Sequence, residues 1–224
     1  GHITLKTPRS ILQGHECDEC YMKRMRKPIQ LSDGRTFESG TAAAKALGVH
    51  AQVEWPDATL GRIAAFIITA SEGGALHLDN LRHHIEEMEP LSVDRFMSGA
   101  LQPAAWYIKA QRFRRIYRDK VNALFENWDV LLAPATPVSA PVIGTDWLEI
   151  QGQTLPSRAA MGLLTQPISF AGCPVVAAPM WPSLNDGLPL GIQIISAPWR
   201  EDLAFRVAKQ LESLGVCQVK KVEL

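Results

Sequence analysis

The feature that most constrains the fold is an unbroken apolar run, Val130-Leu131-Leu132-Ala133, which follows a long amphipathic helical pattern and ends at Pro134. A strand that is apolar on both faces needs cover on both faces, which is typical of a parallel or mixed sheet covered by helices. Val175–Ala178 and Leu190–Ile195 are two further strand candidates. Because these runs alternate with helical segments, the sequence predicts an α/β fold with a mixed sheet covered by helices. The residues Pro134–Pro141 are too rich in proline to continue a strand and are expected to form a loop.

Helical spacing of apolar residues recurs in five other segments. We expect helices over Gly40–Leu47, from Trp55 through Leu76, over Ser92–Ala100, over Gln102–Asn127 and from Glu201 to Leu214. Ser92 is a suitable cap for the third of these helices, and Gly48 a suitable end for the first. Gly73-Gly74 is expected to loosen or kink the second.

The segment Gln102–Asn127 has the clearest helical pattern. An apolar stripe at steps of three and four comprises Phe113, Ile116, Tyr117, Val121, Leu124, Phe125 and Trp128. Much of the rest is basic: Lys109, Arg112, Arg114, Arg115, Arg118 and Lys120. We interpret this basic stripe as a solvated face.

Bulk properties exclude several classes of protein. The 224 residues suffice for one large domain or two small ones, and Lys+Arg and Asp+Glu both total 23, so net charge gives no argument for nucleic acid or an anionic membrane. Apolar runs such as Ala64–Ala70 are far too short to span a bilayer. The four cysteines form no disulfide framework, and Gly1-His2 begins no signal-peptide pattern, so a reducing cytoplasm is the expected location.

The pattern of apolar and turn-forming residues changes at about residue 55. Residues 1–54 are irregular, with turn signals such as Lys27-Pro28 and Asp33-Gly34, and their origin is uncertain. Residues 55–224 carry the strong helical and strand patterns and are expected to form the main domain.

Three blocks in the main domain occur in a specific order. They read DVLLAPATP from Asp129, TQPISFAGCPVVAAPM from Thr165, and GLPLGIQIISAPWRED from Gly187. The second has the form T-x-P-x-x-x-A-G-x-P and the third the form G-x-P-x-G-x-Q-x-I. Together they resemble the carboxy-terminal part of an amidase-signature enzyme. ITASEGGALHLDNL and APWREDLAFRVA are most similar to the branch that includes carboxybiuret and allophanate hydrolases.

The resemblance covers roughly Trp55 to Gly215 and implies an amidase-like C-terminal domain with a partial amidase-signature fold. Such enzymes hydrolyse or transfer amide bonds with a Ser–Ser–Lys set on an earlier Gly/Ser-rich segment. This sequence contains no such segment. We therefore assign no catalytic residue to the chain. The resemblance implies a small amide or urea-like substrate, and its implied partner is a complementary amidase segment or a small accessory subunit. It implies no cofactor and no metal, and we expect no membrane or nucleic-acid partner.

The resemblance also implies that two segments line the acyl pocket of the enzyme. The candidate substrate-binding residues are Pro134, Thr136, Thr165, Gln166, Ile168, Ser169, Phe170 and Gly172. Loops at strand ends are where α/β sheets place their ligand sites, and these residues supply hydroxyls, an amide and a glycine that permits close approach. The alternative for each single side chain is that Pro167, Gly172 and Pro174 only shape the chain between a helix and a strand.

Ser71-Glu72-Gly73-Gly74 is the single superficial candidate for a segment that carries the nucleophile. A serine needs a nearby base to attack an amide. This segment lies within an apolar helical run with no lysine near it in sequence, so we expect it to serve helix packing. His77, His83 and His84 look like a metal cluster, but adjacent histidines cannot share a helix face, and we expect surface residues.

The first 50 residues contain two further motifs. His15-Glu16-Cys17-Asp18-Glu19-Cys20 has the spacing of a zinc or redox site but an incomplete ligand set, and incidental surface cysteines are the preferred interpretation. Ser32–Phe37 followed by Ala42–Val49 faintly resembles small helix-turn-helix modules, and Tyr21–Lys27 could contact a phosphate backbone. A turn followed by an alanine-rich helix is the preferred interpretation.

Three functions remain open from the sequence. The chain is the carboxy-terminal part of an amidase-type hydrolase, or a non-catalytic binding or assembly protein on an amidase scaffold, or a zinc or nucleic-acid module fused to an amidase remnant. In the first case, the basic stripe of Gln102–Asn127 leaves open a surface for tRNA or an acidic partner, because some family members work on tRNA.

Overall fold

The structure is a computed structural model of the chain and describes residues 29–30, 43, 45–48, 53–181 and 187–220. The motifs at 15–20, 21–27 and 32–37 therefore lie outside the described residues, as does most of the helix expected over Gly40–Leu47. Of that helix, Ala43, Lys45 and Ala46 are helical, and Gly48 has a φ of 66°.

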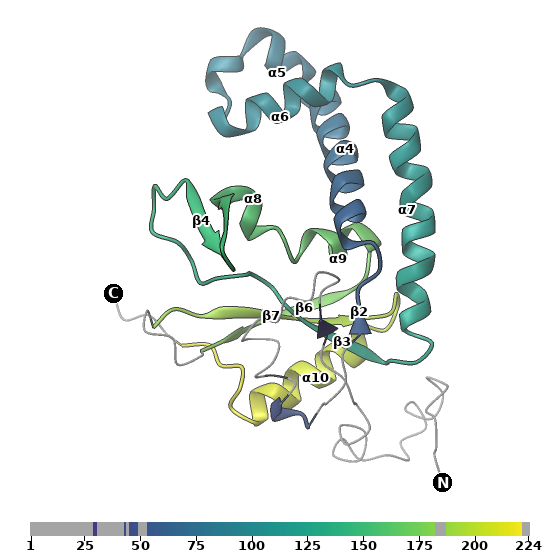
Figure 1. Cartoon of the computed structure of the whole chain (residues 1–224), viewed down its shortest axis with the longest axis vertical. Coiled ribbons are helices and arrows are strands. Elements are labelled where there is room, and N and C mark those ends of the chain that lie inside the picture. Colours follow the sequence, from purple (N-terminus) through teal and green to yellow (C-terminus); the bar gives the residue numbers. More distant parts are fainter. Residues whose placement is uncertain (1–28, 31–42, 44, 49–52, 182–186, 221–224) are drawn as a thin grey trace.

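A three-stranded sheet lies between α10 (Glu201–Ser213) below and the other labelled helices above in the view of Figure 1. The central strand, β7 (Leu190–Ser196), pairs antiparallel with β3 (Val130–Pro134) on one side and with β6 (Val175–Met180) on the other. All three strands fall where the apolar runs predict them, and β3 extends one residue further, to Pro134. Among the described residues, parallel pairing is confined to two short strands, β1 (Ile29–Gln30) and β2 (Val53–Glu54).

Helices lie on both faces of the sheet, as the apolar runs predict, but Val175 and Ala177 of β6 stay exposed on one face. Helix α10 (Glu201–Ser213) packs on one face and forms the first core cluster with Val130, Leu132, Ile192, Ile194, Leu203, Ala204, Val207 and Leu211. The opposite face meets α4 (Ala58–Leu76), α7 (Ala104–Leu124) and α9 (Gln166–Ala171). That second core cluster includes Leu131, Ala133, Ile195, Ala64, Ile68, Tyr117, Val121, Ile168 and Phe170.

The helices α4, α5 (Leu78–His83), η1 (Ile85–Glu87), α6 (Pro90–Leu101) and α7 form an arm that extends away from the sheet (Figure 1). The pair Gly73-Gly74 does not end the helix, because α4 continues to Leu76. The glycines instead let two helices touch: a Cβ on Gly99 of α6 would lie 1.8 Å from the Ala70 carbonyl oxygen of α4.

Two local expectations are wrong. The cap of α6 is Glu89 and not Ser92, because the Leu91 amide donates to Glu89 Oε1 (3.1 Å) and the Ser92 hydroxyl donates to Glu89 Oε2 (2.6 Å). Ile116, placed in the apolar stripe of α7, is 52% exposed, because Ala110, Tyr117 and Val121 are the residues of this helix that reach the core.

A hairpin and a short helix precede α9. The strands β4 (Trp147–Ile150) and β5 (Gln153–Pro156) are joined by Gln151 and Gly152, whose φ angles are 51° and 76°. Positive φ at both turn residues suits the twist of a two-residue hairpin. Helix α8 (Ser157–Met161) follows and leads toward α9. Among the described residues, no helix is long and apolar enough to cross a lipid bilayer.

Candidate functional site

The two predicted lining segments meet at one side chain of the central strand. Gln193 of β7 is only 4% exposed, and its Nε2 donates to the Pro134 carbonyl at 2.9 Å and to the Leu164 carbonyl at 3.3 Å. Pro134 ends β3, and Leu164 immediately precedes the segment Thr165–Gly172. The structure therefore brings together the end of β3 and the start of α9, which lie about 30 residues apart in the sequence.

The lining residues differ in what they present at the surface. Ile168 and Phe170 lie in the second core cluster, at 2% and 6% exposure, and Pro134 is buried within β3. These three side chains face the protein interior and are part of the packing beneath the two predicted lining segments. Thr136, Thr165 and Gln166 are partly exposed, and Ser169 and Gly172 are exposed.

Hydrogen bonds to α7 help to fix the position of helix α9. The Trp55 indole donates to the Tyr117 hydroxyl (2.6 Å), which in turn donates to the Pro167 carbonyl (3.1 Å). Burial raises the pKa of the Tyr117 phenol well above its usual value, so the hydroxyl stays protonated and remains a donor. Arg114 donates to the Phe170 carbonyl (3.1 Å) and places its guanidinium over the Phe170 ring.

Arg62 of α4 is a residue of this region that the sequence did not point to. Its Nε donates to Gln166 Oε1 (3.3 Å), and another guanidinium nitrogen donates to the Ala159 carbonyl (3.2 Å). Partial burial lowers the pKa of Arg62. In the sequence, Arg62 stands out only as a charged residue within the apolar pattern of α4. That pattern does not predict which residues Arg62 binds.

Comparison with known proteins decides the family. The amidase family model matches residues 50–205, which include both lining segments and most of the described chain. The chain belongs to the amidase-signature family.

The relatives of this amidase chain include a hydrolase subunit and an amidotransferase subunit. It is 65% identical over 178 residues to AtzE, a 1-carboxybiuret hydrolase subunit of Pseudomonas sp. (strain ADP), across 80% of this chain and 39% of that protein. It is 27% identical over 201 residues to a glutamyl-tRNA(Gln) amidotransferase subunit of Staphylococcus aureus (strain JH9), across 79% of this chain and 40% of that protein.

A solved structure supports the same grouping. A vestigial protein complex, described as revealing the evolutionary origins of an s-triazine catabolic enzyme, matches with a TM-score of 0.81 and 58% identity, over 87% of this chain and 44% of that one. A crystal structure of an amidase matches with a TM-score of 0.73 at 23% identity, which concerns the fold alone. The amidase chain thus spans less than half the length of these relatives.

The prediction that Ser71–Gly74 serves helix packing in this amidase chain is confirmed. Ser71 accepts a hydrogen bond from Gln102 Nε2 at 2.5 Å, and Glu72 accepts one from the Tyr107 hydroxyl at 2.9 Å. Both bonds join α4 to the segment that begins α7. Gly73 and Gly74 face α6, where a Cβ on either would meet Phe96 or the backbone of Ala100.

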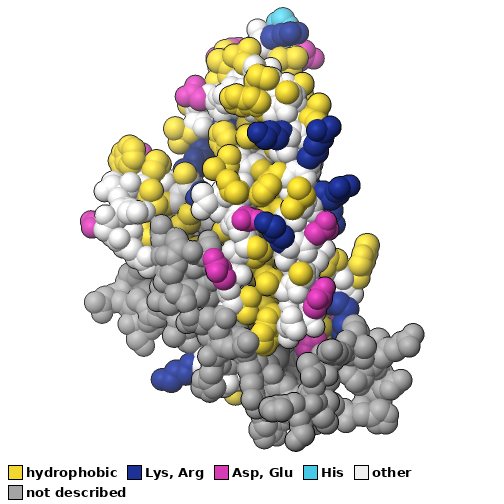
Figure 2. Space-filling model, turned by 45° about the vertical axis from the view of Figure 1, so that its right-hand side comes forward, with side chains coloured by type: hydrophobic (Ala, Val, Ile, Leu, Met, Phe, Trp, Pro, Cys, Tyr) yellow, Lys and Arg dark blue, Asp and Glu magenta, His cyan; other side chains and the backbone are white. Residues whose placement is uncertain are grey.

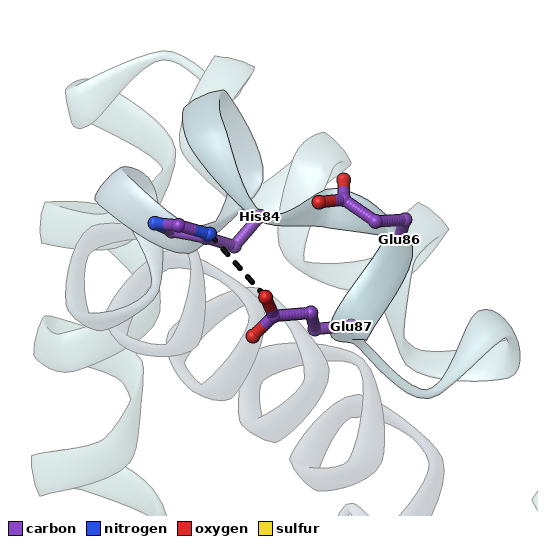
Figure 3. Close-up of side chains that lie close together, drawn as sticks. All are labelled: His84, Glu86 and Glu87. Carbon is purple, nitrogen blue, oxygen red and sulfur yellow. Dashed lines mark ion pairs between the residues drawn. The ribbon is translucent and has the colours of Figure 1, made fainter.

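The histidines form no built site among the described residues. His84 lies 3.5 Å from Glu87 Oε1, and Glu86 is close to both (Figure 3). All three side chains are exposed on a short turn, an arrangement that is common without an ion. His83 is exposed as predicted, whereas His77 is half-buried and stacks on Phe96 with ring centroids 4.9 Å apart.

The basic stripe of α7 is partly engaged within the chain. Arg114 holds α9, and Lys120 pairs with Asp57 at 2.6 Å just before α4. On the face turned forward in Figure 2, basic side chains lie among apolar ones. Trp106 and Ile108 of α7 are each at least half exposed. The described residues therefore offer a mixed surface rather than a continuous basic one.

Proposed function

We propose that this chain is the carboxy-terminal part of an amidase-type hydrolase that cleaves the C–N bond of a small amide or urea-like substrate. The proposal rests on the 65% identity to a carboxybiuret hydrolase subunit over 178 residues. The activity named for that relative is the hydrolysis of 1-carboxybiuret, a small urea-like compound.

The chain contributes the back wall of the acyl pocket and a complementary segment contributes the nucleophile. A serine hydroxyl is a poor nucleophile at neutral pH and needs a nearby base, and no lysine of this sequence can be assigned that role. Ser71, the one superficial candidate, is occupied in helix packing with Gln102. Thr165, Gln166 and Ser169 offer hydroxyl and amide groups, which can form hydrogen bonds with the C=O and N–H groups of an amide or urea.

The proposed partner is a complementary amidase segment or a small accessory subunit. Two findings support it: the chain spans 39% of the carboxybiuret hydrolase relative, whose name marks it as one subunit of an enzyme, and the 58% identical structure is of a protein complex. We further propose a cytoplasmic location, because the cysteine pattern suits a reducing compartment. No metal or cofactor is needed for this chemistry.

An activity assay tests the proposal. The chain is mixed with the portion of the carboxybiuret hydrolase relative that lies outside the 39% matched here, and ammonia release from 1-carboxybiuret and from other small amides is measured. We expect no turnover by either piece alone and turnover by the mixture. Robust turnover by this chain alone would contradict the proposal. A folded chain that stays inactive in every mixture favours a non-catalytic protein on an amidase scaffold.

A further inference from the structure

Gln193 is a polar residue among buried apolar residues of strand β7. Its neighbours Ile192, Ile194 and Ile195 are all 0% exposed, and Gln193 itself is 4% exposed. A buried amide costs free energy unless its hydrogen bonds are made, so a leucine or methionine would pack in this position at lower cost. The amide must therefore serve contacts that an apolar side chain cannot make.

The strand pairing leaves space for this side chain. Gln193 stands opposite Ala133 of β3 and opposite Ala177 of β6, and paired residues of antiparallel strands point to the same face. Two small neighbours let the long side chain extend over the sheet toward α9. Two residues earlier, Gly191 accepts from the Ala135 amide at 2.8 Å, and a Cβ there would come within 2.7 Å of the Ala135 side chain.

Both acceptors of Gln193 are main-chain carbonyls outside β7. The side-chain amide has two N–H donors, so one hydrogen serves Pro134 and the other serves Leu164. Neither bond belongs to the regular ladder between strands. Each instead fixes the backbone from which a lining segment departs, at Ala135–Thr136 and at Thr165–Gly172.

We infer that Gln193 is a positioning residue, whose amide clamps the exit of β3 to the entry of α9 and so sets the spacing of the two lining segments. The inference rests on the proposed function for its catalytic consequence, but the clamp itself is a property of this chain. Gln193→Met keeps the length and bulk of the side chain and removes both donors. Gln193→Glu keeps the shape and replaces the donors with oxygen atoms that face two carbonyls.

Gln102 provides a matched control. Its Nε2 also donates to two acceptors, the Ile67 carbonyl (2.9 Å) and the Ser71 hydroxyl (2.5 Å), but both lie on the arm. Gln102→Met therefore removes the same two donors at the junction of α4 with the start of α7, without breaking a bond to either lining segment.

Hydrogen exchange tests the clamp in the chain by itself. The amides of Ala135, Gln166 and Ser169 donate to backbone carbonyls and serve as probes. We expect Gln193→Met to speed exchange at these probes roughly tenfold or more, with little change in the centre of β7 and in α10. Gln102→Met should instead speed exchange near Ile67–Ser71. Unchanged exchange at the three probes, or an equal rise throughout β7 and α10, would overturn the inference.

Kinetics of the complemented enzyme test the consequence. Gln193→Met and Gln193→Glu should lower kcat at least about tenfold, while Gln102→Met keeps kcat within about twofold at a comparable loss of thermal stability. Equal losses of kcat in the Gln193 and Gln102 variants would reduce Gln193 to a stabilising residue. If the wild-type mixture shows no turnover, the proposed function fails, and the exchange experiment still decides whether the clamp exists.

Discussion

At the scale of single residues, the candidate site depends on polar side chains that bind main-chain carbonyls. Gln193, Tyr117 and Arg62 each donate to a carbonyl of a segment far away in the sequence. Residue types of this kind are visible in the sequence, but their partners are not, because the pairing depends on how the helices pack on the sheet. This is why Pro134 and Thr165–Gly172 are proposed as a candidate site only through family resemblance.

Removing the Tyr117 hydroxyl should destabilise the chain. Tyr117→Phe leaves the Trp55 indole N–H and the Pro167 carbonyl without their partner in a region that water does not reach. We expect a loss of about 1–3 kcal/mol in the free energy of unfolding, measured with urea. Tyr107→Phe is the control, because the Tyr107 hydroxyl also has two partners, Glu72 and Gln111, but both bonds lie at a site that water can reach, so the loss should be the smaller of the two, below about 1 kcal/mol. Equal losses in the two variants would refute the account of Tyr117.

The cysteines Cys173 and Cys217 should make stability fall at alkaline pH. Burial raises the pKa of each thiol to about 11, while a thiol in the unfolded chain has a pKa of about 8.5. The folded state thus favours the neutral thiols. Their contribution to stability is full below about pH 8.5 and is lost as the pH rises through about 11.

Urea unfolding between pH 8 and pH 11 measures this effect. The fall should be smaller in a variant with both Cys173→Ala and Cys217→Ala, because the remaining groups titrate alike in the two proteins. Mass spectrometry after brief alkylation at pH 7.5 gives a second measure, in which both thiols should react slowly. A pH dependence that is identical with and without the two thiols would disprove their role.

At the scale of elements, the pattern of apolar residues predicts most of what is observed. The strands β3, β6 and β7 and helix α10 occur within one or two residues of the expected bounds, because their apolar pattern coincides with burial in two separate cores. The hairpin β4–β5 has no such signal, since Trp147 and other residues in it face solvent. The pair Gln151-Gly152 between two short alternating runs was the available clue.

The crossing of α4 and α6 should not tolerate a larger residue at Gly99. A methyl group at Gly99 would overlap the Ala70 carbonyl at 1.8 Å, and a backbone atom cannot move aside as a flexible side chain can. We expect Gly99→Ala to cost about 3 kcal/mol or more, the upper range for overpacking. Thermal unfolding followed by circular dichroism measures the change.

Gly162→Ala is the control for that substitution. The nearest atom to a Cβ there is 3.9 Å away, and Gly162 has a φ of −87°, which alanine adopts readily. Its stability should stay unchanged or rise by up to about 1 kcal/mol. If Gly99→Ala is tolerated as well as Gly162→Ala, the close approach of α4 and α6 is not real.

At the scale of the whole molecule, cover on the sheet is complete on one face and partial on the other. The α10 face buries residues from all three strands, whereas Val175 and Ala177 of β6 are exposed on the opposite face beside Gln193. The run VVAAPM nevertheless reads as apolar throughout, which is typical of a strand buried on both sides. Under the proposed function, the complementary segment supplies this cover. The sequence predicts β6, but it does not predict that one face of this strand is exposed.

The most direct test of the central claim locates the nucleophile. A fluorophosphonate, which reacts with activated serines, is added to this chain alone and to its mixture with the remaining portion of the carboxybiuret hydrolase relative, and mass spectrometry locates the label. We predict no label on this chain in either sample, Ser71 and Ser169 included, and label on a serine of the added portion. Stoichiometric labelling of any serine of this chain by itself would show that it carries its own nucleophile and would contradict the account.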